Sequence, residues 1–227
     1  MNPTFYPADP TRSTGALLVL AHGAGAGQSH PFMVRYARGL SAHGIDVVTF
    51  DFPYMAAGRK APDRAPVLEQ AFREAIDAAV ARPELSTTRL FIGGKSMGGR
   101  IATHLAVPAG GAASSGEDNA RPLEGVIALG YPLHPPGGGK QDRVSHLFQT
   151  RVPILIVQGT RDNFGGPDDL RAALGDRAPH VSIHTVEGGD HSFAVLKSRG
   201  KTQSAVDSEL FAAVSSWLSL PRRPSGA

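Results

Sequence analysis

The chain has 227 residues, of which 41% are hydrophobic and 19% are charged, as expected for one soluble globular domain with a sizeable core. A net charge of only +3 with scattered Lys and Arg argues against nucleic-acid binding, and the lack of Cys excludes disulfides, thiolate metal sites and a Cys nucleophile. No apolar run is long enough to span a membrane and residues 1–15 do not resemble a signal peptide, so we expect a cytoplasmic protein.

Short apolar runs alternate with longer amphipathic stretches along the chain. Most runs are continuous, which is typical of strands covered on both faces, and they span residues 16–20, 47–50, 90–92, 126–129, 154–157 and 181–183. Helical periodicity predicts helices over residues 32–42, 65–81, 97–106, 168–174 and 205–218. This alternation predicts an α/β fold, a three-layer α/β/α sandwich around a mostly parallel sheet.

The domain organisation is expected to be simple. We expect one domain over residues 1–227, with an N-terminal extension at 1–14 and a disordered tail at 221–227. Residues 108–122 are rich in Gly, Ala and Ser without periodicity, which predicts a surface loop. Residues 132–143 form a Pro- and Gly-rich loop after a strand end, where sites form in parallel sheets.

The first chemical signal lies between the third expected strand and the helix after it. Gly94-Lys95-Ser96-Met97-Gly98 fits the pattern G-x-S-x-G, in which a sharp turn lifts a serine above the sheet and flanking glycines allow close packing. We therefore expect Ser96 to be a nucleophile and the Met97 N–H to be an oxyanion donor. In a Gly-rich chain the bare pattern also arises by chance, but the strand–turn–helix context favours the catalytic interpretation. A phosphate-binding loop would need Gly at position 89, which is Arg.

A second Gly-rich segment, His22 to Gly27, follows the first expected strand. Such a loop lets backbone N–H groups face a substrate oxygen, so we expect Ala24 to supply the second oxyanion donor, with Gly25 as the alternative. A plain Gly-rich turn is the competing interpretation. A dinucleotide-binding loop is not favoured, because its third Gly would stand at position 28, which is Gln. His22 is expected to hold the loop rather than to take a proton.

An acid and a base complete the expected site. Asp162 follows the strand at 154–157, and His191 follows the last expected strand after two glycines. Asp190 competes as the acid, but adjacent side chains generally point apart, so Asp162 is preferred. The resulting chain order, Ser96 then Asp162 then His191, is that of the α/β-hydrolase triad.

These motifs resemble the α/β-hydrolase superfamily from residue 15 to residue 218, and within it the dienelactone-hydrolase-like proteins. The segments 20–27, 130–137 and 158–162 look like those of the group that includes testis-expressed protein 30 and the hydrolase-like domain of the KAT8 regulatory NSL complex subunit 3. The resemblance implies the same roles for Ser96, Asp162 and His191. Superfamily members usually have more strands before the one at 16–20, so we expect a reduced sheet of about six or seven strands and a minimal lid.

The expected function is hydrolysis of a carboxylic ester or thioester of a small substrate by a serine-dependent, carboxylesterase-like enzyme, with no metal or cofactor. The alternatives are a non-catalytic binding or scaffold protein on a hydrolase fold, or a peptidase or C–C hydrolase of the same superfamily. We expect no nucleic-acid partner, and the oligomeric state is open. Pocket residues are expected to include Gly25, Tyr54, Tyr131, His134 and Phe164. Lys95 and Arg100 are expected to be solvated surface charges, with attraction of an anionic acyl group as the alternative.

Overall fold

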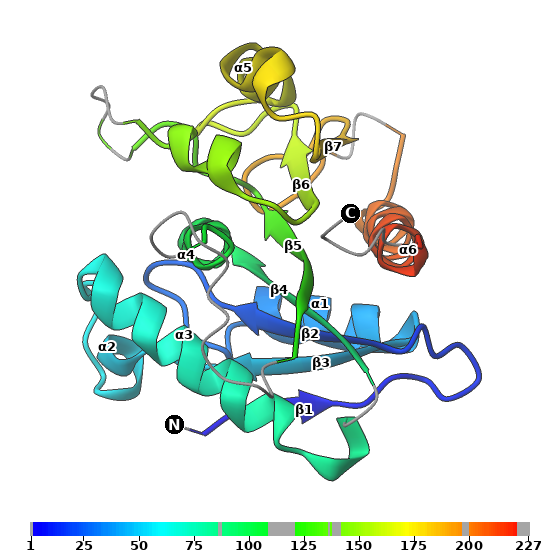
Figure 1. Ribbon diagram of the computed structural model, residues 1–227. Coiled ribbons are helices and arrows are strands. Elements are labelled where there is room, and N and C mark those ends of the chain that lie inside the picture. Colours follow the sequence, from blue (N-terminus) through cyan, green and yellow to red (C-terminus); the bar gives the residue numbers. More distant parts are fainter. Residues whose placement is uncertain are drawn as a thin grey trace.

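The computed structural model describes residues 2–85, 88–108, 121–135, 137, 142–196 and 200–221, and Figure 1 shows how their elements are arranged. The strands are β1 (Thr4–Tyr6), β2 (Ala16–Ala21), β3 (Ile45–Phe50), β4 (Arg89–Lys95), β5 (Leu123–Leu129), β6 (Ile154–Gly159) and β7 (Val181–Val186). The helices are α1 (Pro31–Ala42), α2 (Pro53–Ala56), α3 (Ala65–Val80), α4 (Met97–Leu105), α5 (Pro167–Leu174) and α6 (Gln203–Ser219). Short 3₁₀ turns are η1 (Pro83–Leu85), η3 (Ser145–Gln149) and η4 (Gly175–Arg177).

The expected fold class is confirmed. The seven strands form one sheet in the order β1-β3-β2-β4-β5-β6-β7, and every neighbouring pair is parallel except β1 with β3. Each expected strand and helix is present near its expected bounds. Most of the loop expected at 108–122 and of the tail expected at 221–227 lies outside the described residues.

The N-terminal extension contains a strand that the sequence pattern did not predict. Phe5 of β1 pairs antiparallel with Val48 of β3, so residues 4–6 lengthen the sheet beyond the six expected strands. A three-residue strand at a sheet edge is partly exposed and too short to give a periodic signal. Its place in the sheet is therefore decided by pairing with β3.

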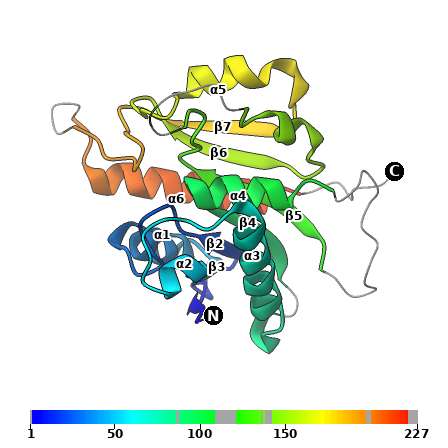
Figure 2. The ribbon, with the colours of Figure 1, turned by 90° about the vertical axis from the view of Figure 1, so that its left-hand side faces the viewer.

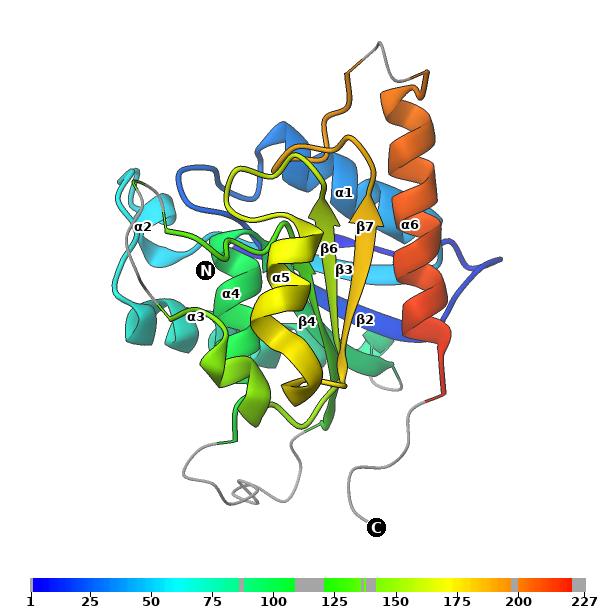
Figure 3. The same ribbon diagram turned by 90° about the horizontal axis from the view of Figure 1, so that it is seen from above.

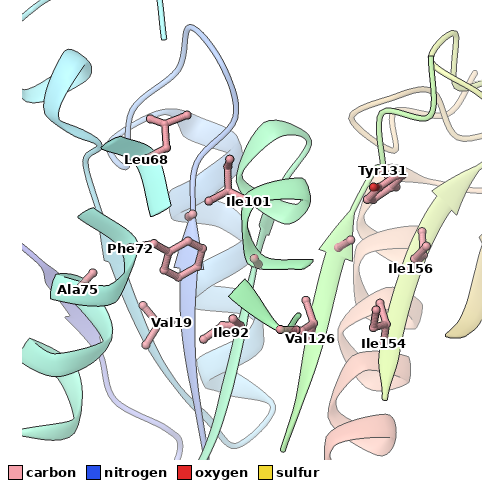
Figure 4. Close-up of a cluster of buried hydrophobic side chains, with 14 of the residues drawn as sticks. Val19, Leu68, Phe72, Ala75, Ile92, Ile101, Val126, Tyr131, Ile154 and Ile156 are labelled. Atoms are coloured by element: carbon pink, nitrogen blue, oxygen red, sulfur yellow. The ribbon is translucent and has the colours of Figure 1, made fainter. Parts of the chain in front are cut away.

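Helices cover both faces of the sheet, as Figures 2 and 3 show. Residues of α1 and α6 pack with one face, and residues of α3, α4 and α5 pack with the other. Strand β2 illustrates why the apolar runs are continuous: all of its residues are buried, with Leu18 and Leu20 in one cluster and Leu17 and Val19 in the other. Figure 4 shows the second cluster, where Val19, Ile92 and Val126 meet Phe72 and Ile101. The helices packed on both faces of the sheet hold the ends of its strands in place.

No helix in the described part of the chain has both the length and the apolar composition that crossing a membrane requires.

The turn between β4 and α4 depends on glycines that leave no room for a side chain. A Cβ on Gly98 would lie 2.5 Å from the carbonyl oxygen of His22, and one on Gly94 would lie 2.4 Å from the carbonyl carbon of Gly98. The obstacles are backbone atoms, which cannot turn aside as a side chain can. The glycines therefore let α4 pack directly on the ends of β2 and β4.

Gly98→Ala is expected to lower the free energy of unfolding by about 3 kcal/mol or more, because the methyl group must displace the backbone at the end of β2. Urea denaturation checks this value. Gly166→Ala is the matched control, since a Cβ there has its nearest neighbour at 3.7 Å, and it should change stability by less than about 1 kcal/mol. Equal stability of the two variants would contradict the close approach at Gly98.

Candidate active site

Ser96 stands at the tip of the turn between β4 and α4. Its backbone has φ 50° and ψ −112°, a conformation that L residues seldom adopt. The Ser96 N–H donates to the carbonyl oxygen of Leu129 at 3.0 Å, which ties the turn to the end of β5. The strained turn leaves the Ser96 side chain at the carboxyl edge of the sheet, on the wall of a cavity.

His191 and Asp162 meet Ser96 at this edge, although the three residues come from separate loops. Ser96 Oγ donates to His191 Nε2 at 2.9 Å, and His191 Nδ1 donates to Asp162 Oδ2 at 2.7 Å. Because an ionised carboxylate only accepts hydrogen bonds, the proton of a neutral His191 ring resides on Nδ1 and leaves Nε2 free to accept. The residues thus form a continuous chain from hydroxyl to carboxylate.

Asp162 is held by donors to both of its oxygens. Its side chain is fully buried. Oδ1 accepts from the Phe164 N–H at 2.8 Å, and Oδ2 accepts from Gln158 Nε2 at 2.9 Å as well as from His191. These hydrogen bonds stabilise a buried negative charge and fix the direction in which the carboxylate points.

Gln158 is a positioning residue that the sequence analysis missed. Its Nε2 also donates to the carbonyl oxygens of Gly165 at 2.6 Å and Tyr131 at 3.2 Å, and its Oε1 accepts from the Tyr131 N–H at 2.7 Å. One buried amide therefore joins the loops after β5 and β6 to the carboxylate of Asp162. In the sequence, Gln158 begins the segment 158–162 noted above and is a polar residue inside an otherwise apolar strand, which a buried partner has to satisfy.

Asp190 orders the histidine loop from within. Its Oδ1 accepts from the backbone N–H groups of Ser192 at 2.8 Å and Ala194 at 2.9 Å, whereas the carboxylate that reaches His191 belongs to Asp162. Phe193 adopts φ 62° and is completely buried beside α1. The buried ring of Phe193 and the two hydrogen bonds accepted by Asp190 hold the loop that carries His191 in place.

The loop after β2 passes directly beside Ser96. A Cβ on Gly23 would lie 3.6 Å from Ser96 Cβ, and the next residue, Ala24, lines the cavity together with Met97. His22 holds this loop: its Nδ1 donates to the Gly23 carbonyl oxygen at 2.8 Å, and its Nε2 accepts from the Phe52 N–H at 3.0 Å. Burial lowers the pKa of the His22 ring, which keeps it neutral for both bonds.

A cavity of about 460 Å³ opens above Ser96, a size typical of small-molecule sites. Of the expected pocket residues, Phe164 lines it, with its ring edge-on to His191 at 4.6 Å between centroids. Four others lie elsewhere. Tyr54 and Tyr131 are fully buried in the core, His134 is exposed, and the loop presents Ala24 rather than Gly25 to the cavity. Position near a strand end did not reveal in which direction these side chains point.

The expectation that Lys95 is a surface charge is wrong. Only 8% of Lys95 is exposed, and its Nζ is buried without a hydrogen-bond partner among the described residues. The side chain leaves β4 toward α1, where Nζ lies 5.6 Å from the centre of the Phe32 ring. Burial lowers the pKa of the Lys95 ammonium to about 7, although Asp162 and Asp190 act in the opposite direction.

Lys95→Met is expected to raise the free energy of unfolding at pH 6 by about 2 kcal/mol, because it removes a buried and unpartnered charge. The unfolded chain keeps the lysine proton up to about pH 10.5, whereas the folded protein releases it near pH 7. Wild-type stability therefore rises with pH between these values, and the difference from Lys95→Met should shrink. Urea denaturation of both proteins at pH 6, 8 and 9.5 measures this difference in the free energy of unfolding. The exposed control Lys60→Met should show no such dependence, and a constant difference at Lys95 would contradict the buried charge.

Comparisons with known proteins agree with this architecture. A family model described as an alpha/beta hydrolase domain matches residues 14–219. Among solved structures, an alpha-beta serine hydrolase homologue from Coxiella burnetii aligns with a TM-score of 0.69 and 16% sequence identity, covering 93% of this chain and 90% of that chain.

Two further structures show the same fold. XC6422 from Xanthomonas campestris, a lidless member of the a/b serine hydrolases, has a TM-score of 0.66 and 19% identity over 98% of this chain and 90% of that chain. A dienelactone hydrolase from Anabaena variabilis has a TM-score of 0.65 and 17% identity over 97% of this chain and 92% of that chain. At these identities the likeness concerns the fold.

Proposed function

This chain belongs to the alpha/beta hydrolase domain family, and on that premise we propose that it is a serine hydrolase that cleaves a carboxylic ester or thioester of a small substrate. The observation that carries the proposal is the hydrogen-bond chain from Ser96 Oγ through His191 to Asp162, with distances of 2.9 Å and 2.7 Å, at the wall of the cavity. Fold alone does not assign activity, but this geometry is the one that activates a hydroxyl.

In the proposed mechanism, Ser96 Oγ attacks the substrate carbonyl carbon while His191 Nε2 takes the hydroxyl proton. Asp162 holds the ring in the required tautomer and stabilises the imidazolium. The N–H groups of Met97 and Ala24 stabilise the oxyanion, and each such donor is worth about 3 kcal/mol. His191 then protonates the leaving alcohol or thiol. Water, deprotonated by His191, attacks the acyl-enzyme and releases the acid and free Ser96.

Two measurements on the wild-type protein test the proposal. A fluorophosphonate probe should label Ser96, as located by mass spectrometry of the digested protein, because the probe reacts with activated serines. A series of p-nitrophenyl esters from acetate to decanoate should be hydrolysed, with an optimum set by the cavity. Ser219→Ala, at the exposed end of α6, is the labelling control. If Ser96 stays unlabelled and no ester is cleaved, a non-catalytic binding protein on this fold replaces the proposal.

A further inference from the structure

The cavity above Ser96 carries an excess of positive charge. Its lining includes Lys95, Arg100 and Arg143, and no Asp or Glu is among its described lining residues. Charged groups on a low-dielectric wall attract ions of the opposite sign and raise their local concentration. The composition of the wall therefore favours an anionic ligand over a neutral one.

Arg100 is fixed relative to the nucleophile. It lies one turn into α4, and its N–H donates to the carbonyl oxygen of Ser96 at 3.0 Å. Its guanidinium Nη1 donates to His104 Nε2 at 3.1 Å. Burial and the charge of Arg100 lower the pKa of His104, so this partner is a neutral ring, and its Nδ1 lies 3.6 Å from Glu69 Oε1. Within the described part of the chain, Arg100 forms no ion pair with a carboxylate.

Arg143 comes to the same cavity from the loop between β5 and η3. Its Nη1 donates to the Pro132 carbonyl oxygen at 3.0 Å, and its own carbonyl oxygen accepts from the buried Tyr131 hydroxyl. Arg100 and Arg143 line the same cavity, and burial together with the charge of Arg100 lowers the pKa of Arg143.

Two like charges beside a cavity repel each other, and a bound anion relieves that repulsion. We propose that Arg100 and Arg143 form a carboxylate-binding subsite, so that the substrate of this hydrolase is a small ester or thioester with a free carboxylate on its acyl or its alcohol portion. The inference rests on the proposed function and names its substrate class. Guanidinium groups match the two oxygens of a carboxylate with parallel hydrogen bonds.

Lys95 supports the subsite independently. Its Nζ is buried 5.6 Å from the centre of the Phe32 ring with no hydrogen-bond partner among the described residues, and below about pH 7 the protonated amine adds positive charge to the cavity lining. Together with the two arginines of the lining, a protonated Lys95 makes the cavity electrostatically suited to an anion. The cavity volume of about 460 Å³ restricts that anion to a small molecule.

Matched ester pairs test the subsite on each side of the scissile bond. Mono-p-nitrophenyl adipate is compared with p-nitrophenyl hexanoate for the acyl side, and 4-acetoxybenzoate with its methyl ester for the alcohol side. The wild-type kcat/KM for the anionic member of one pair should exceed that for its neutral partner by about tenfold or more. Arg100→Gln and Arg143→Gln should each lower this ratio about tenfold, and Arg100→Glu should invert it.

Arg171→Gln is the control, since Arg171 is exposed on α5, pairs with Asp168 and is absent from the described cavity lining. In this variant, the ratio of kcat/KM for the anionic ester to kcat/KM for the neutral ester should equal that of the wild type. A wild-type ratio near one in both pairs, or a ratio that neither Arg100→Gln nor Arg143→Gln lowers, would overturn the proposal.

Calorimetric binding to the Ser96→Ala protein separates the subsite from catalysis. Adipate should bind, its uncharged diamide should not, and Ser96→Ala combined with Arg100→Gln should lose adipate binding. If esters are not cleaved but adipate binds through Arg100, the proposed function fails and the subsite stands. If esters are cleaved but adipate does not bind, the subsite alone fails. Binding of inorganic phosphate without binding of adipate would also overturn a carboxylate site.

Discussion

Replacing Ser96 with alanine is expected to lower kcat/KM for the best p-nitrophenyl ester by roughly 10³-fold or more, because the proposed nucleophile is lost while the cavity and the proposed oxyanion donors remain. The residual rate would come from binding and from backbone N–H groups that polarise the carbonyl. Steady-state hydrolysis, corrected for the spontaneous rate, measures the loss.

The same variant should fold normally. The Ser96 backbone N–H still donates to Leu129, and alanine at φ 50° meets the same backbone strain as serine. Its free energy of unfolding should therefore stay within about 1 kcal/mol of the wild type. A folded Ser96→Ala protein that hydrolyses esters at the wild-type rate would remove Ser96 from the mechanism.

Asp162→Asn is expected to lower kcat by about 10³- to 10⁴-fold. An amide placed against His191 can donate its own N–H and thereby favour the tautomer with the proton on Nε2, which cannot accept the proton of Ser96. The amide also has one acceptor oxygen, whereas the carboxylate of Asp162 serves Phe164, Gln158 and His191 with two. The loss should appear in kcat more than in KM, because substrate contacts are unchanged.

Asp190→Asn is the matched control for this assignment. Asp190 uses Oδ1 for the N–H groups of Ser192 and Ala194, and an asparagine oxygen can accept the same two bonds. We therefore expect kcat to fall by less than about tenfold. A larger loss in Asp190→Asn than in Asp162→Asn would reverse the roles given to the two acids.

Much of the fold follows from local sequence patterns. Continuous apolar runs mark the six long strands because each is covered by helices on both faces, and 3.6-residue periodicity marks the helices between them. The elbow around Ser96 was also predictable, since only glycines at positions 94 and 98 allow its close packing. These features leave a local pattern of residue types in the sequence, although the packing behind the pattern involves other segments.

Other features depend on contacts between segments far apart in the sequence. The strand Thr4–Tyr6 exists through its pairing with β3. Gln158 lies in an apolar strand, and its bonds to Asp162 and Tyr131 appear once the loops after β5 and β6 meet. No periodicity encodes such contacts, because they follow from the order of strands in the sheet.

The sequence by itself determined the α/β class, the approximate element bounds and the candidate residues Ser96, Asp162 and His191 with their order. Only the tertiary structure decided which acid reaches His191, which side chains line the cavity and where Lys95 lies. The physical reason is directional: a sequence gives the position of a residue along the chain, while the direction of its side chain at the sheet edge is set by the elements packed around it. For this reason Tyr54 and Tyr131 lie in the core, whereas Arg100 and Arg143 line one cavity.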